Sequence, residues 1–270
     1  MLQQLYSRER IARETELESV VSKVKEAFVA KHQDKVQMPS KIYLTFDEFN
    51  GDLRTMPAYI PSFDLATVKI VNAHPENPSR HNLPTVMALV AAINPETGQP
   101  LAVLDGSEIT ALRTAAASAL STRCFAPDGS TVLGLFGTGA QAPYQIEGQL
   151  NEINFDRIIL HDIDTDSARE LKEWVEARHP DISVVIAEEP EELIEQCDVI
   201  NSLTPSKSPL IESFTELSKP VLLNALGADS HDKQEWPDRI LNHFKIVVDD
   251  WEQASHSGEI SQRVAAGNFT

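Results

Sequence analysis

The 270-residue chain carries 41 Asp and Glu residues against 23 Lys and Arg residues, which gives a formal net charge of −18 at pH 7. This excess of acid argues against a nucleic-acid-binding or anionic-membrane-binding protein, because both partners demand clustered cations. A chain of this length, with 41% hydrophobic and 24% charged residues, has room for two compact domains and lacks the composition of a disordered protein.

Targeting and redox features favour a cytoplasmic location. The N-terminal residues have no apolar signal region, and no apolar run reaches the roughly 18 residues of a membrane span. Cys124 and Cys197 are the two cysteines, and neither stands in a CxxC pattern. The sequence therefore predicts neither a disulfide framework nor a zinc ribbon.

The first ~105 residues read as a mostly β, α+β domain. Apolar residues three, four and seven positions apart predict an amphipathic helix over 8–32, with Leu17, Val24 and Phe28 on its buried side. Pro95–Gly98 predicts a turn with a glycine where φ can be positive. Apolar and alternating runs predict strands over 38–46, 53–59, 67–71, 85–94 and 101–104.

A helix is predicted over 105–120, because Asp105 is a good N-cap, Glu108 follows three residues on, and strong helix formers continue to Leu120. Its many alanines allow another element to pack closely against it. We expect this helix to lead into a second domain that begins near Ser121.

Strands and helices alternate through the second half, which predicts a doubly wound parallel sheet. We therefore expect an α/β protein with a mostly β, α+β domain over 1–120 and a dinucleotide-binding Rossmann domain over 121–270. The predicted strands cover 131–136, 157–162, 182–187, 198–203, 221–226 and 245–249, and the predicted helices cover 144–150, 165–179 and 191–196.

The strand over 131–136 ends in Gly137-Thr-Gly139-Ala-Gln-Ala142, the G-x-G-x-x-A form of the dinucleotide-binding motif. Gly137 permits the tight turn, Gly139 lets the backbone approach a pyrophosphate, and Ala142 lets the helix lie close to the strand. The helix N-terminus then offers N–H groups to the phosphates.

The next predicted strand ends in Asp162, 25 positions after Gly137, near the spacing at which a carboxylate meets ribose hydroxyls. An acid there would repel a 2′-phosphate, so the pattern favours NAD over NADP. The alternative is an ordinary strand–turn–helix with Asp162 as a solvated strand end.

In family order, five phrases of the chain resemble the ornithine cyclodeaminase/μ-crystallin family, and they cover nearly its whole length. They are Val71–Asn77, Leu83–Ala88, Ile109–Ala116, Gly137–Ala142 and Gly227–Glu235. The resemblance implies NAD(P)-dependent chemistry on a small α-amino acid, a homodimer built through the β-rich domain, and a site between the domains. It thus makes residues 1–120 a substrate-binding and dimerisation domain. Family members usually run on for roughly another fifty residues, so we expect either a natural short form or a truncated one.

The resemblance also implies roles for single residues. It assigns substrate contacts to Lys69 and Arg113, a part in catalysis to Lys69, and the acid/base role to Asp229. Cations are the residue type that a substrate carboxylate requires, although a structural ion pair or a solvated strand lysine is the alternative for each. The implied cofactor contacts are Thr114, Gly137, Thr138, Gly139, Ala140, Gln141, Asp162 and, by position only, Thr204.

Two positions bear on the substrate. Many relatives have Arg where this chain has Lys41, and the ornithine cyclodeaminases carry Glu where it has Arg54. Arg54 would repel the distal amine of ornithine, and the pair resembles the archaeal alanine dehydrogenase branch. Lys41 could also lie on an ordinary solvated face. His74 stands in a family phrase, where a hydrogen-bonded structural role is the commoner outcome.

We therefore expect an NAD-dependent oxidoreductase that converts a small L-amino acid, with alanine first, to a keto acid and ammonium, or the reverse. An ornithine cyclodeaminase, a ketimine reductase and a nucleotide-binding protein without turnover are the alternatives. The eight histidines show no metal-ligand spacing, so no metal is expected.

Overall fold

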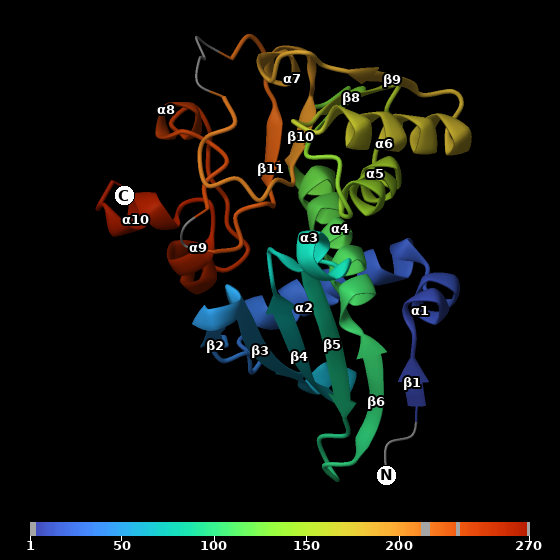
Figure 1. Ribbon diagram of the computed structural model, residues 1–270, viewed down its shortest axis with the longest axis vertical. Helices are drawn as coiled ribbons and strands as arrows, with labels where there is room; N and C mark the ends of the chain where they lie inside the picture. Colours follow the sequence, from blue (N-terminus) through green and yellow to red (C-terminus); the bar gives the residue numbers. More distant parts are fainter. Residues whose placement is uncertain (1–3, 212–216, 231–232, 269–270) are drawn as a thin grey trace. The chain divides into compact units, whose positions relative to one another are not determined.

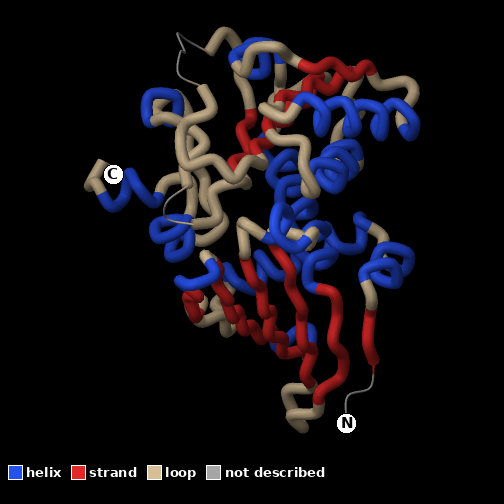
Figure 2. Tube along the Cα trace, in the orientation of Figure 1, coloured by secondary structure: helices blue, strands red, loops and turns tan. Residues whose placement is uncertain are grey.

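The computed structural model describes residues 4–211, 217–230 and 233–268. The chain divides into two compact units, Met1–Ala116 and Ala117–Thr270, and each unit contains one β-sheet (Figures 1 and 2). Among the helices of the described residues, none is long and apolar enough to cross a membrane.

The first unit is built on a six-stranded sheet in the order β1-β6-β5-β4-β3-β2. Neighbouring strands are antiparallel except β1 and β6, which are parallel. The strands are β1 (Gln4–Tyr6), β2 (Ile42–Phe46), β3 (Gly51–Ile60), β4 (Leu65–Ala73), β5 (Val86–Ile93) and β6 (Pro100–Asp105). The predicted β-rich half is confirmed, with β1 as an addition.

The helices of this unit before Gly106 are α1 (Arg8–Glu14), the longer α2 (Leu17–His32), α3 (Asn77–His81) and the 3₁₀ turns Asp47–Phe49 and Pro61–Phe63. The single helix predicted over 8–32 is wrong, because Thr15 and Glu16 have extended backbone angles that separate α1 from α2. The predicted turn before β6 is confirmed, and Gly98 has φ +70° there.

The strand register separates the two faces of this sheet. Residues paired across neighbouring strands share a face, and residues two apart on one strand do so too. One face carries large apolar side chains that are exposed in the chain: Leu5, Ile42, Leu44, Met87 and Leu89. An exposed apolar sheet face of this kind is typical of a protein–protein interface.

Helix α4 (Gly106–Phe125) follows β6 and runs across the boundary between the two units. Its start confirms the predicted cap, because the Asp105 carboxylate accepts the Glu108 N–H at 2.8 Å. Its alanines do pack closely: Ala115, Ala116 and Ala119 are all completely buried.

The second unit is a five-stranded parallel sheet in the order β11-β10-β7-β8-β9. Chain order reverses between β7 and β10, which is the switch point of a doubly wound fold, and the predicted fold class is confirmed. Its strands are β7 (Val132–Phe136), β8 (Arg157–His161), β9 (Ser183–Ile186), β10 (Val199–Ser202) and β11 (Leu222–Ala225); its helices are α5 (Ala142–Leu150), α6 (Thr165–Arg178), α7 (Glu191–Gln196), α8 (Asp238–Leu241), α9 (Trp251–Ser257) and α10 (Ser261–Ala265).

Alternate residues of these strands enter two apolar layers, as expected for a sheet covered on both faces. One layer contains Leu133, Leu135 and Ile146, and the other contains Phe136 and Trp236. The strand predicted over 245–249 is wrong, because that segment pairs with no strand of the described residues. Its apolar side chain at Ile246 packs against the second layer instead.

Candidate active site

The glycine-rich loop lies between β7 and α5, at the switch point of the parallel sheet. Gly137 has φ +91°, and a Cβ there would come within 3.2 Å of the Leu203 backbone, so this position requires glycine. A Cβ built at Gly139 would meet no atom of the described residues within 4 Å. The loop is therefore bare at the position where the motif brings a pyrophosphate closest, and its geometry fits a dinucleotide.

The carboxylate of Asp162, just beyond β8, is held against this loop. It accepts hydrogen bonds from the Thr138 N–H at 2.7 Å and the Thr138 hydroxyl at 2.9 Å, and its other oxygen accepts the Asp164 N–H at 2.9 Å. The predicted ribose-binding acid thus has a defined orientation, one residue past the end of the strand next to β7. Ala140 and Gln141 complete the turn, and α5 begins at Ala142.

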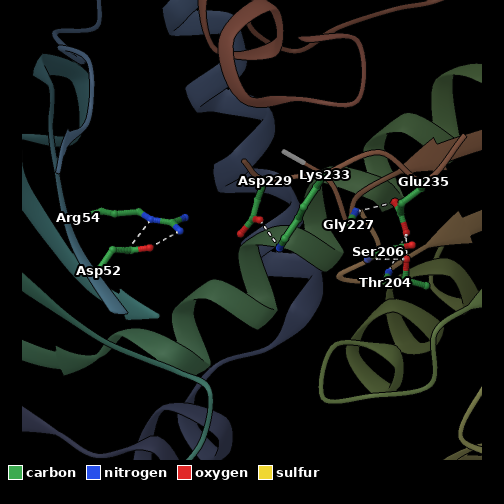
Figure 3. A network of polar contacts seen from close by, with 8 residues as sticks. All are labelled: Asp52, Arg54, Thr204, Ser206, Gly227, Asp229, Lys233 and Glu235. Carbon is green, nitrogen blue, oxygen red and sulfur yellow. Dashed lines mark hydrogen bonds and ion pairs between the residues drawn. The ribbon is translucent and has the colours of Figure 1, made fainter. Parts of the chain in front are cut away.

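Two further loops begin at the carboxyl ends of β10 and β11, and Figure 3 shows their polar contacts. Thr204 follows β10, and its N–H and hydroxyl both donate to one oxygen of Glu235 at 2.8 Å. Gly227 follows β11, and its N–H donates to the other Glu235 oxygen at 2.9 Å. Asp229 lies two residues farther on, with 58% of its side chain exposed, and pairs with Lys233.

A second acid, Glu259, binds the backbone of the segment that carries Glu235. The Glu259 carboxylate accepts the N–H groups of Glu235 and Trp236, the latter at 2.6 Å. Burial raises the pKa of Glu235. Burial, with the neighbouring Glu235 charge, raises the pKa of Glu259 to about 7.

In the first unit, the register places three of the four predicted substrate residues, Lys41, Arg54 and Lys69, on the sheet face opposite to the apolar face. Met56 pairs with Lys69, so Lys69 lies diagonally from Arg54, roughly 7 Å away by strand geometry. Lys41 directly precedes β2, and continuing the register of that strand places it beside Met56. The three cations, which span 28 positions of the sequence from Lys41 to Lys69, therefore lie on one face of the sheet.

Arg54 has a fixed orientation within this group. Its guanidinium makes two hydrogen bonds to the Asp52 carboxylate, at 2.8 and 2.9 Å (Figure 3). It also lies over the Tyr43 ring. Two parallel bonds and a ring contact restrain the planar group far more than one bond would. A planar guanidinium held in this way matches the geometry of a planar carboxylate.

The other predicted residues of the first unit lie on α4 and at the end of β4. Arg113 is exposed on α4, and the Thr114 hydroxyl donates to the Thr110 carbonyl at 2.7 Å. His74 stacks on Phe46, and its ring fills the space beside Gly51. These contacts favour a structural role for His74. The described residues contain no group of three or more His, Cys, Asp or Glu arranged to hold a metal ion.

Sequence reasoning missed Asp52, Lys233, Glu235 and Glu259. Asp52 stands two residues before Arg54 on the same strand, which is the spacing that puts two side chains on one face. Glu235 lies inside a phrase already recognised, eight residues after Gly227 and next to Trp236. An acid beside a large apolar residue could have indicated burial, but nothing local indicates Glu259.

Similarity to known proteins covers the chain. The family model described as ornithine cyclodeaminase/mu-crystallin family matches residues 1–269. The alanine dehydrogenase of Archaeoglobus fulgidus is 40% identical over 263 residues, which are 95% of this chain and 79% of that protein. The ketimine reductase mu-crystallin of Rattus norvegicus is 31% identical, over 83% of this chain and 70% of that protein.

Solved structures agree with these sequence matches. An archaeal alanine dehydrogenase dimer with bound NAD superposes with a TM-score of 0.90 at 37% identity, covering 100% of this chain and 81% of that one. A Thermococcus litoralis Delta(1)-pyrroline-2-carboxylate reductase in complex with NADH and L-proline superposes with a TM-score of 0.91 at 27% identity, covering 100% and 82%.

Proposed function

This chain belongs to the ornithine cyclodeaminase/mu-crystallin family, and from that premise we propose that it is an NAD-dependent, alanine dehydrogenase-like oxidoreductase. The reaction takes L-alanine, NAD⁺ and water to pyruvate, ammonium, NADH and a proton, or runs in reverse. The observation that carries the choice of substrate is the cationic sheet face of Lys41, Arg54 and Lys69.

The cofactor site is the loop from Gly137 to Ala142, with Asp162 on the ribose and Thr204 at the neighbouring strand end. Bound there, NAD supplies the hydride acceptor. The bare surface at Gly139 and the N–H groups that begin α5 suit the diphosphate. The carboxylate of Asp162 favours a ribose 2′-hydroxyl over a 2′-phosphate, because two anions in contact repel.

The substrate carboxylate is assigned to the guanidinium of Arg54, with Lys41, Lys69 and Arg113 as further cationic contacts. Asp52 and Tyr43 hold Arg54 in one orientation, so binding costs little further ordering of that side chain. A cation at position 54 disfavours a substrate with a second amine, which argues for a compact amino acid over ornithine.

Asp229 is assigned as the acid/base residue. It stands at the carboxyl edge of a doubly wound sheet, where ligands of such folds bind, and its exposed carboxylate is accessible to water. After loss of hydride from Cα, this group accepts the proton of the water that adds to the imine carbon. The keto acid and ammonium follow from collapse of that adduct.

The active protein is proposed to be a cytoplasmic homodimer. The exposed apolar face of Leu5, Ile42, Leu44, Met87 and Leu89 supports this proposal. A second copy of the chain is the natural occupant, since a two-fold axis pairs one such face with its own image.

Incubation of the purified protein with L-alanine and NAD tests the function through the absorbance of NADH. The expected result is alanine-dependent NADH formation, and reverse turnover from pyruvate, ammonium and NADH. Proline formed from ornithine without net NADH would instead identify a cyclodeaminase. NAD binding by calorimetry with no turnover of any amino or keto acid would refute the enzyme assignment.

Asp229→Asn tests the acid/base assignment. Turnover should fall by roughly 100-fold or more, the usual scale of losing a general acid/base, while NAD still binds. Asp181→Asn is the matched control, because Asp181 is an exposed acid in the turn before β9. Unchanged turnover in Asp229→Asn would exclude Asp229 as the acid/base residue.

A further inference from the structure

Glu235 is completely buried, and its carboxylate accepts hydrogen bonds from four donors. One oxygen accepts the Thr204 N–H and hydroxyl, both at 2.8 Å. The other accepts the Ser202 hydroxyl at 2.7 Å and the Gly227 N–H at 2.9 Å. A carboxylate with every contact a hydrogen-bond donor is an acceptor held in place, not a group poised to release a proton.

These donors come from two neighbouring strand ends. Ser202 is the last residue of β10, and Thr204 opens the loop after it; Gly227 lies two residues beyond the end of β11. Since β10 and β11 are parallel and adjacent, Glu235 joins two loops at the carboxyl edge of the sheet. The backbone of the same segment adds to the tie, as Leu210 N–H donates to the Glu235 carbonyl at 2.8 Å.

Gly227 shows how closely these loops approach. A Cβ at this position would overlap the Thr204 carbonyl oxygen and both the carboxyl carbon and one oxygen of Glu235. The backbones therefore meet without an intervening side chain, and a shift of either loop moves the other. Asp229, two residues after Gly227, is carried on the loop that this contact fixes.

We infer that Glu235 is a positioning residue for the reaction: it ties the loop after β10 to the loop after β11 and so sets the place of Asp229 and Thr204. The inference rests on the proposed function, because it assigns these two residues to the acid/base and cofactor roles. Glu235 itself touches neither substrate nor cofactor in this account.

A merely structural role is the competing explanation, and the chain contains a matched control for it. Asp198 directly precedes β10, at the opposite end of the same strand. Its carboxylate accepts the Thr131 and Val132 N–H groups, each at 2.9 Å, and pairs with Lys219 at 2.6 Å. Asp198 therefore joins neighbouring segments as Glu235 does, but at the amino edge of the sheet.

The test compares Glu235→Gln with Asp198→Asn, both nearly isosteric. In Glu235→Gln the new NH₂ group faces backbone or hydroxyl donors, so one loop must move. We expect kcat for alanine oxidation to fall by about 10- to 100-fold, the scale of a misplacement near 1 Å. The calorimetric Kd for NAD shows which loop moves, because a displaced Thr204 weakens NAD binding and a displaced Asp229 leaves it unchanged. Asp198→Asn should lose stability while keeping kcat within about twofold.

Ser202→Ala is the milder second variant, since it removes one of the four donors and leaves the carboxylate with three. Its kcat should fall by a few fold, which decides the question if Glu235→Gln does not fold. A kcat in Glu235→Gln equal to that of the wild type would overturn the inference. If Glu235→Gln does not fold, a wild-type kcat in Ser202→Ala would overturn it. So would an equal loss of kcat in Asp198→Asn.

Failure of the proposed function is separable. If the wild-type protein forms no NADH from alanine, that function fails, and the tie is then judged from amide proton–nitrogen NMR spectra. In Glu235→Gln the amide signals of Thr204, Gly227 and Asp229 should move together. Shifts confined to the residues around position 235 would overturn the inference without reference to turnover.

Discussion

Glu259→Gln should remove a pH-dependent part of the stability of the second unit. The folded protein holds the Glu259 proton more tightly than the unfolded chain does, because the pKa rises from 4.5 to about 7 on burial beside Glu235. Between these pH values the folded state binds more protons, so stability falls as pH rises. The contribution is complete below pH 4.5 and is lost as pH rises through 7.

The magnitude follows from the two pKa values. Integrating the linkage relation from pH 5 to pH 8 gives a loss of roughly 2 to 3 kcal/mol for this one group, which is most of its full contribution. Glu259→Gln has no proton to release, so its free energy of unfolding should fall by roughly 2 to 3 kcal/mol less than that of the wild type over this range.

Urea unfolding followed by tryptophan fluorescence measures this difference. Trp174, Trp236 and Trp251, the three tryptophans of the chain, all belong to the second unit, so the signal follows the unit that contains Glu259. Glu170→Gln, at an exposed position of α6, makes the same change in net charge and should keep the wild-type pH dependence. Parallel curves for the wild type and Glu259→Gln would refute the reasoning.

Asp162→Ser should raise the ratio of kcat/KM with NADP to kcat/KM with NAD by about 10- to 100-fold. The variant loses one charged hydrogen bond to the ribose of NAD and no longer repels the 2′-phosphate of NADP. An unchanged ratio, or an equal change in the control Asp166→Ser, would contradict the ribose assignment. Leu44→Asp should weaken the dimer by roughly 100-fold in sedimentation experiments, since each of two copies loses about 1.5 kcal/mol or more of apolar burial. Phe125→Asp, at an exposed apolar residue of α4 in the second unit, is its control, and a dimer that tolerates Leu44→Asp would exclude this face.

Local signals in the sequence were reliable where a few consecutive residues decide the structure. The turn at Gly137 needs only a strand, a glycine that can adopt a positive φ, and a following helix. The signals for all three lie within twelve residues of the sequence. The Asp105 cap of α4 and the turn ending at Gly98 are of the same kind. Backbone geometry over one turn leaves few alternatives to such patterns.

The errors lie where a local pattern can be satisfied in two ways. Residues 245–249 resemble a strand because three β-branched residues, 246 to 248, follow one another. Ile246 nevertheless packs, partly buried, against the layer around Trp236 without joining the sheet. The helical spacing over 8–32 hides a break at Thr15 and Glu16, since hydrophobic periodicity says which side is buried but not whether the backbone is continuous.

The chain by itself determined the class of the second unit and the place of its nucleotide loop, because strand period and motif spacing are properties of sequence. The register of β2, β3 and β4, which places Lys41, Arg54 and Lys69 on one face of the sheet, came only with the structure. Only the tertiary structure also decided which acid joins the loops after β10 and β11. Glu235 collects donors from residues 202, 204 and 227, which lie 8 to 33 residues away along the chain. Such contacts join segments brought together by folding, and no spacing along the chain encodes which buried acid will meet which N–H group.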